Sequence, residues 1–75
     1  MEVAIEYCAL WNYDPEAASL AKAIEKKFGI KSKLIKSGGG VFEVTVDGSK
    51  IFSKKQTGRF PENQEIFKSI QQLQQ

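Results

Sequence analysis

The N-terminal part of the chain alternates apolar and polar side chains with a period of two. Over residues 3–7, one face carries Val3, Ile5 and Tyr7, and the other carries Ala4 and Glu6. This period is typical of a β-strand with one buried face. A weaker strand pattern at residues 31–36 precedes a glycine-rich run at residues 37–40. We therefore expect two strands in the first half of the chain, with Cys8 directly after the first.

The clearest strand pattern lies at residues 41–46, where apolar side chains alternate with Glu43 and Thr45. It leads into Asp47-Gly48, a dipeptide favoured in two-residue hairpin turns because both central residues adopt positive φ. The return strand is expected at residues 50–53. A loop over residues 54–60 should then lead to the last helix.

Two segments have the period of an amphipathic helix. The first, residues 15–28, follows Asp14 as the expected N-cap, has Pro15 at its first position and stops at Gly29. Its apolar stripe consists of Ala17, Leu20, Ala21, Ile24 and Phe28. The second helix begins at about residue 61, and its stripe consists of Ile66, Phe67, Ile70 and Leu73.

The expected order of elements is therefore β-α-β-β-β-α. A right-handed crossover makes the first two strands parallel neighbours, and the hairpin makes the last two antiparallel. Both helices can then cover one face of a four-stranded mixed sheet, which gives a two-layer α/β fold. Because 75 residues have room for one hydrophobic core, we assign residues 1–75 to a single domain.

The charged residues are distributed rather than clustered. The formal net charge is +2, and the hydrophobic content of 41% is that of an ordinary globular protein. The lysines are scattered along the chain, whereas nucleic-acid binding would be better supported by clustered arginines with interleaved aromatic residues on one face, so this class is disfavoured.

Cys8 is the single cysteine of the chain, which also has no histidine. One cysteine cannot form an internal disulfide, so we expect a reducing compartment and a cytoplasmic location. Glu2 and Glu6 interrupt any N-terminal apolar run, so neither a signal peptide nor a membrane span is expected. Without the usual soft ligands, a metal site within one chain is not expected either.

Three segments occur in an order and spacing that are specific together, although each is common alone. They are Ile5-Glu6-Tyr7-Cys8 with Tyr13 beyond it, Gly40-Val41-Phe42-Glu43-Val44, and Ser53-Lys54-Lys55 running to Thr57-Gly58-Arg59-Phe60-Pro61. Together they resemble the selenoprotein W-like, or Rdx, family of thioredoxin-fold proteins. The resemblance implies a thioredoxin-like fold with strand order 2-1-3-4, a cytosolic location and a thiol-redox role.

The resembling family places two redox residues after its first strand, a cysteine and then a second cysteine or selenocysteine three positions later. Cys8 carries over, but Trp11 stands at the second position. Trp11 cannot resolve a disulfide, so what remains is a mixed disulfide of Cys8 with glutathione or a partner protein, released by an external thiol. This implies at most a weak glutathione-dependent monothiol oxidoreductase with no bound cofactor. Because the tryptophan and selenocysteine codons differ by one base, Trp11 as a replacement for selenocysteine stays an open alternative.

The candidate site centres on Cys8, which we expect to be exposed as the nucleophile at the strand end. The residues flanking the thiol are Tyr7, Ala9, Leu10, Trp11 and Tyr13. The candidate contacts for glutathione or a partner are Gly40, Phe42, Lys55, Arg59 and Phe60. The glycines at residues 38–40 should let the backbone pass close to the Cys8 loop. Small thiols or a redox partner protein are the expected partners, and a monomer or weak dimer is the expected state.

A rival interpretation stays open for the same residues. Cys8 can be a small buried hydrophobe, as free cysteines commonly are, and Trp11 can pack over the loop or anchor a partner. The protein is then a non-catalytic interaction module that keeps the thioredoxin-like fold. The sequence has no proline between Pro15 and Pro61 to serve as the cis-proline that thioredoxins place beside their active site, and this argues against fast turnover.

Overall fold

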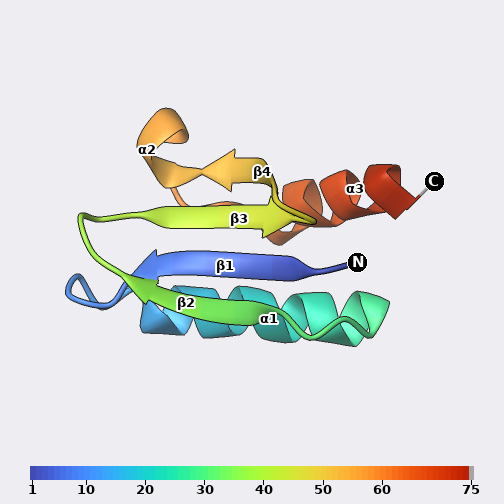
Figure 1. The fold of residues 1–75 in the computed structure, drawn as a ribbon, viewed down its shortest axis with the longest axis horizontal. Helices are drawn as coiled ribbons and strands as arrows, with labels where there is room; N and C mark the ends of the chain where they lie inside the picture. Colours follow the sequence, from blue (N-terminus) through green and yellow to red (C-terminus); the bar gives the residue numbers. More distant parts are fainter. Residues whose placement is uncertain (75) are drawn as a thin grey trace.

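The computed structural model describes residues 1–74 and folds them into a mixed sheet with helices packed against it (Figure 1). The elements are β1 Val3–Cys8, α1 Asp14–Phe28, β2 Lys33–Ser37, β3 Phe42–Val46, β4 Ser49–Ser53, α2 Lys54–Thr57 and α3 Asn63–Gln74. The four strands and the two long helices follow the expected order. Their bounds differ from the expected ones by one or two residues at most.

The strand β1 lies at the centre of the sheet, whose strand order is β2-β1-β3-β4. It runs parallel to β2, where Ile5 lies opposite Leu34, and antiparallel to β3, where Ile5 lies opposite Val44. β3 and β4 form the antiparallel hairpin. The expected strand order 2-1-3-4 is thus confirmed.

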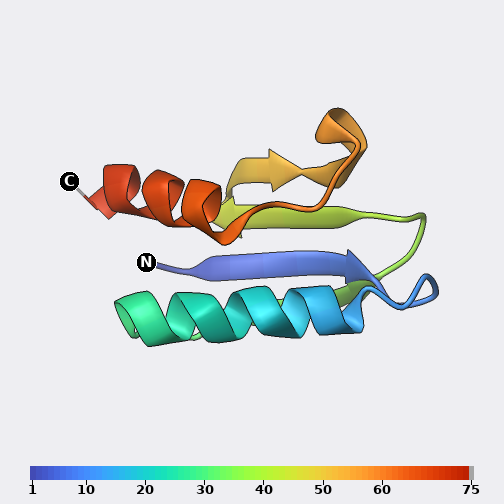
Figure 2. The same ribbon diagram turned by 180° about the vertical axis from the view of Figure 1, so that it is seen from behind.

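Both long helices lie on the same face of the sheet, as the two opposite views show (Figures 1 and 2). The core between the layers consists of Val3, Ile5, Tyr7, Ala17, Leu20, Ile24, Phe42, Val44, Val46, Phe52, Ile66 and Ile70. These residues include the predicted inward positions of β1 and β3. Leu73, expected in the last stripe, is instead 50% exposed, because the final turn of α3 extends past the end of β3 (Figure 1).

The helix α1 begins one residue earlier than predicted. Tyr13, rather than Asp14, is the N-cap, since its carbonyl accepts a hydrogen bond from the Ala17 N–H at 3.0 Å. Asp14 lies in the first helical turn, where an acidic side chain is favourable beside the helix N-terminus. The predicted Asp14 cap is therefore wrong, while the stop at Gly29, with φ of 71°, is as expected.

The hairpin between β3 and β4 has the predicted turn, with φ of 50° at Asp47 and 84° at Gly48. It also contains an irregularity that the pattern did not reveal. Val44 lies opposite Phe52 but the next residue, Thr45, lies opposite Lys50, which leaves Ile51 as the extra residue of a β-bulge. The bulge lets consecutive residues, Ile51 and Phe52, both pack against the core.

The segment predicted as a loop after β4 contains the one-turn helix α2. The Thr57 hydroxyl donates a hydrogen bond to the Ser53 carbonyl at 3.0 Å, and Gly58, with φ of 75°, ends the turn. Such a short helix buries no apolar stripe, so periodicity could not predict it. In Figure 1, α2 lies at the same end of the sheet as the loop after β1 and the connection between β2 and β3.

Candidate functional site

The loop after β1 folds into a compact six-residue turn. The Cys8 carbonyl accepts a hydrogen bond from the Tyr13 N–H, and the Ala9 carbonyl accepts one from the Asn12 N–H, both at 3.1 Å. Asn12 has φ of 63°, in the left-handed region that asparagine tolerates better than most residues. Two nested bonds with a left-handed fifth residue are the arrangement of a Schellman motif. The turn therefore has a defined backbone conformation that leads directly into α1.

The same loop is held by both strands that neighbour β1. The Cys8 N–H donates to the Val41 carbonyl at 2.8 Å, and the Ala9 N–H donates to the Ser37 carbonyl at 3.0 Å. The Cys8 side chain is 0% exposed. The expectation of an exposed nucleophile is therefore wrong for this conformation.

Trp11 projects from the turn and lies against the connection between β2 and β3. A β-carbon built on Gly40 would be 2.6 Å from Cζ3 of Trp11, so the indole rests directly on the glycine backbone. Gly40 itself is buried, with φ of 74°, whereas Trp11 is 61% exposed and its neighbour Leu10 is 86% exposed. The expected close approach of the glycine run to the Cys8 loop is thus confirmed.

An aromatic cluster joins the turn to the segment that follows α2. The Tyr13 and Phe60 rings meet edge to face with centroids 4.8 Å apart, and Phe60 meets the buried Phe42 in the same way at 5.3 Å. The Lys54 ammonium lies over the rings of Tyr13 and Phe60, at 5.4 and 5.2 Å from their centroids. Such cation–π contacts hold the lysine beside the loop.

The structure brings most of the predicted site residues together. Tyr7 is a buried core residue, Ala9 is half-buried, and Gly40, Phe42 and Phe60 lie around the turn as described. Lys55 also belongs to this end of the molecule, since its Nζ would be 3.8 Å from a β-carbon on Gly39.

Arg59 has other partners. Its guanidinium forms a two-bond ion pair with Glu65, with Nη1–Oε1 and Nη2–Oε2 distances of 2.6 and 3.1 Å, and donates to the Phe60 carbonyl. These bonds raise the pKa of Arg59 and lower the pKa of Glu65, chiefly through the hydrogen bonds between the two side chains. Arg59 therefore connects α2 to α3, and we do not assign it to the site.

The Glu43 carboxylate on β3 binds two residues of β4 next to the start of α2. The sequence pattern did not predict this hydrogen-bond network. The Ser53 hydroxyl donates to Oε2 of Glu43 and the Lys50 ammonium pairs with Oε1, both at 2.7 Å. The hydrogen bond from Lys50, followed by that from Ser53, lowers the pKa of Glu43. Because Ser53 is a buried polar residue directly before Lys54, this network places the start of α2.

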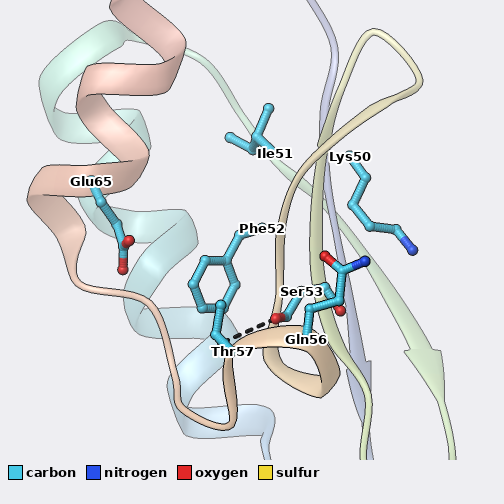
Figure 3. A pocket seen from close by; sticks show the side chains of 7 residues that line it. All are labelled: Lys50, Ile51, Phe52, Ser53, Gln56, Thr57 and Glu65. Carbon is cyan, nitrogen blue, oxygen red and sulfur yellow. Dashed lines mark hydrogen bonds between the residues drawn. The ribbon is translucent and has the colours of Figure 1, made fainter.

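A shallow pocket of about 360 Å³ lies along β4, apart from the turn (Figure 3). It is lined by Lys50, Ile51, Phe52, Ser53, Gln56, Thr57 and Glu65. Among its lining residues, the Thr57 hydroxyl donates a hydrogen bond to the Ser53 carbonyl (Figure 3). No cysteine lines it, so it is separate from the candidate thiol site. Its lining includes the bulge residue Ile51 and two residues of α2, neither of which the sequence pattern predicted.

Comparison with known proteins places this geometry in a family. The model described as the Rdx family matches residues 2–72. The chain is 28% identical over 71 residues to migration and invasion enhancer 1 of Bos taurus and, equally, of Mus musculus. The alignment covers 93% of this chain and 62% of each relative, so the chain spans less than two thirds of their length.

Solved structures show the same fold. The crystal structure of a selenoprotein W-related protein from Vibrio cholerae superposes with a TM-score of 0.92 at 29% identity, covering 96% of this chain and 94% of that one. A crystal structure from Bordetella parapertussis gives 0.90 at 26% identity, covering 95% and 94%. The expected thioredoxin-like architecture is therefore confirmed. Within residues 1–74, every helix is too short or too polar to span a bilayer.

Proposed function

Since this chain belongs to the Rdx family, we propose that it is a cytoplasmic thiol-redox protein that reacts through Cys8 alone. The observation that carries the proposal is the position of Cys8, the last residue of the central strand, at the turn that leads into α1. Three further elements meet around this turn: the glycines at residues 39–40, α2 and Phe60.

Reaction at Cys8 requires the turn to open, because the side chain is fully buried in this conformation. The turn is held by its two internal backbone hydrogen bonds, by the bonds that Cys8 and Ala9 donate to Val41 and Ser37, and by the contact of Trp11 with Gly40. We propose that it opens locally, without unfolding of the rest of the sheet. Surface turns commonly open at a lower free energy than the whole domain unfolds.

The chemistry is thiol–disulfide exchange. The Cys8 thiolate attacks one sulfur of a disulfide, a new sulfur–sulfur bond forms, the old one breaks, and the departing thiolate takes up a proton. Cys8 is thereby oxidised to a mixed disulfide and half of the disulfide is reduced. Because Trp11 holds the position of a resolving thiol, a second, external thiol must release Cys8. Glutathione is the co-substrate that we propose, with slow turnover at most.

The test is the reaction of the folded protein with oxidised glutathione, followed by mass spectrometry. We expect one glutathione per chain, no adduct in Cys8→Ser, and release of the adduct at a rate first order in reduced glutathione. Far-UV circular dichroism recorded in parallel shows that the fold is retained. Modification that begins only at the denaturant concentration of global unfolding would sink the proposal.

A second candidate function, a non-catalytic interaction module, is favoured by one observation. Leu10 and Trp11 are adjacent large apolar residues with 86% and 61% exposure, next to a thiol that is fully buried. Exposed aromatic side chains often anchor partners. Capture experiments with wild type and Cys8→Ser separate the functions, because a redox partner is lost in the variant or on adding reductant, whereas a module keeps the same partner in both.

A further inference from the structure

Two ammonium groups lie beside the turn that contains Cys8. Lys54 is held over the rings of Tyr13 and Phe60, and the Tyr13 N–H is bonded to the Cys8 carbonyl. Lys55 reaches Gly39, two residues before the Val41 carbonyl that accepts the Cys8 N–H. The two lysines are consecutive in α2, and each approaches a different segment that is bonded to Cys8.

The charge of this lysine pair is not neutralised within the described chain. Among residues 1–74, neither ammonium has a carboxylate within salt-bridge distance, since the ion pairs are Lys50–Glu43 and Arg59–Glu65. Glu43 and Glu65 are thus each paired with another cation. The field of Lys55 is still felt at Glu43, where it contributes to the lowered pKa.

Acidic side chains on the other side of the turn limit where a ligand can bind. Asp14 and Glu16 lie in the first turn of α1, which is on the opposite side of the loop from α2 (Figure 1). The lysines attract an anionic group to the α2 side, whereas Asp14 and Glu16 offset the attraction that the N-terminus of α1 would have for it.

We propose that Lys54 and Lys55 make the Cys8 site select thiol and disulfide substrates that carry a carboxylate near the sulfur. The inference rests on the proposed function and adds the chemical class of its substrate. Glutathione and an acidic cysteine-containing peptide share this chemistry. Selection acts on the encounter and on the orientation of the incoming disulfide, while the bonds that form and break are those of the exchange step described above.

The experiment measures rate constants for mixed-disulfide formation with three small disulfides of different charge. Oxidised glutathione is anionic, cystamine is cationic and 2-hydroxyethyl disulfide is uncharged. Each rate constant is divided by that of 2-mercaptoethanol with the same disulfide, which removes the intrinsic reactivity of the probe. A further pair, the disulfides of an Asp-Cys-Glu and a Lys-Cys-Lys peptide with blocked termini, distinguishes a peptide substrate from glutathione.

We expect the normalised ratio of the anionic to the cationic probe to exceed one in the wild type. At a separation of about 7 Å in a water-like dielectric, one charge changes an encounter by about threefold. Because each lysine attracts the anionic probe and repels the cationic one, Lys54→Gln and Lys55→Gln should each lower the ratio by roughly tenfold, and the double variant by on the order of a hundredfold. Salt at about 1 M should remove most of the difference, because it shortens the screening length to about 3 Å.

The matched control is the double variant Lys22→Gln/Lys68→Gln, which removes the same charge from exposed positions on α1 and α3. It should leave the ratio near that of the wild type. An equal fall in both double variants, or no fall in either, overturns the inference while the reaction of Cys8 itself stands. If the uncharged probe does not react with the folded wild type, the proposed function fails and the inference fails with it.

Discussion

Trp11 and Gly40 are in direct contact, and the geometry leaves no room for a side chain on the glycine. A β-carbon there would be 2.6 Å from Cζ3 of Trp11, and Gly40 also has φ of 74°. The contact joins the turn after β1 to the connection between β2 and β3. The position of the exposed Trp11 indole therefore depends on the absence of a side chain at residue 40.

Gly40→Ala should therefore displace the indole and destabilise the protein. A residue with a β-carbon in the left-handed region costs about 1–3 kcal/mol, and the clash adds to this. The free energy of unfolding from urea titration and the emission maximum of Trp11, the single tryptophan, are the two measurements. Gly38→Ala is the matched control, because a β-carbon on Gly38 would meet nothing within 4 Å. Equal losses in the two variants would argue against a specific contact.

A second prediction concerns the missing partner of Cys8. Trp11→Cys should form an internal disulfide on oxidation, because two cysteines three positions apart in a tight turn can bring their α-carbons within about 7 Å. Mass spectrometry should then show a loss of two hydrogens without dimer formation. Ala9→Cys is the control, since directly adjacent cysteines bridge only with strain. Intermolecular dimers or free thiols in Trp11→Cys would mean that the turn lacks this geometry.

The elements that the sequence predicts well are those whose own periodicity decides their structure. The alternation in β3 and the stripe of α1 both place the observed core residues, and the Asp47-Gly48 turn has the expected backbone. α2 was missed because one turn of helix carries no stripe; it depends on Ser53, Thr57 and Gly58 instead.

The sequence predicted that several candidate residues lie close together, but it did not predict that Cys8 is buried. The family pattern correctly brings Gly40, Phe42 and Phe60 to the Cys8 turn, because the topology puts these segments at one end of the sheet. The burial of Cys8 could not be read from the sequence, since strand alternation places it on the face opposite to the core residue Tyr7, and its burial depends on segments that fold around the end of the strand. For the same reason, the position of Lys54 over two rings had no sequence signal.

A third prediction follows from the carboxylate on β3. The folded-state pKa of Glu43 is lowered by the Lys50 and Ser53 hydrogen bonds, so its contribution to stability is present above the unfolded pKa of about 4.3 and is lost as pH falls through the folded value. Glu43→Gln should cost about 1–2 kcal/mol at neutral pH and less at acidic pH. Urea titrations between about pH 3 and 7 measure this.

The control for Glu43 is Glu16→Gln, at an exposed position in the first turn of α1. It should change stability by no more than about 0.5 kcal/mol at neutral pH. Arg59 also lowers the pKa of Glu65. The loss of stability that this group causes at acidic pH is therefore the same in wild type and in Glu43→Gln. A constant stability difference between wild type and Glu43→Gln at every pH would contradict the assigned network.

The last prediction tests whether the turn controls access to Cys8. Asn12 has φ of 63°, and alanine is less well accommodated there than asparagine, while glycine adopts this conformation without strain. Asn12→Ala should weaken the closed turn by about 0.5–1 kcal/mol, which corresponds to a two- to fivefold increase in the open population. Iodoacetamide should then alkylate Cys8 about two to five times faster, whereas Asn12→Gly should differ less from wild type. The two variants share the loss of the amide side chain, so their difference isolates the backbone conformation. If both variants react at the wild-type rate while global unfolding is unchanged, opening of this turn is not the step that exposes Cys8.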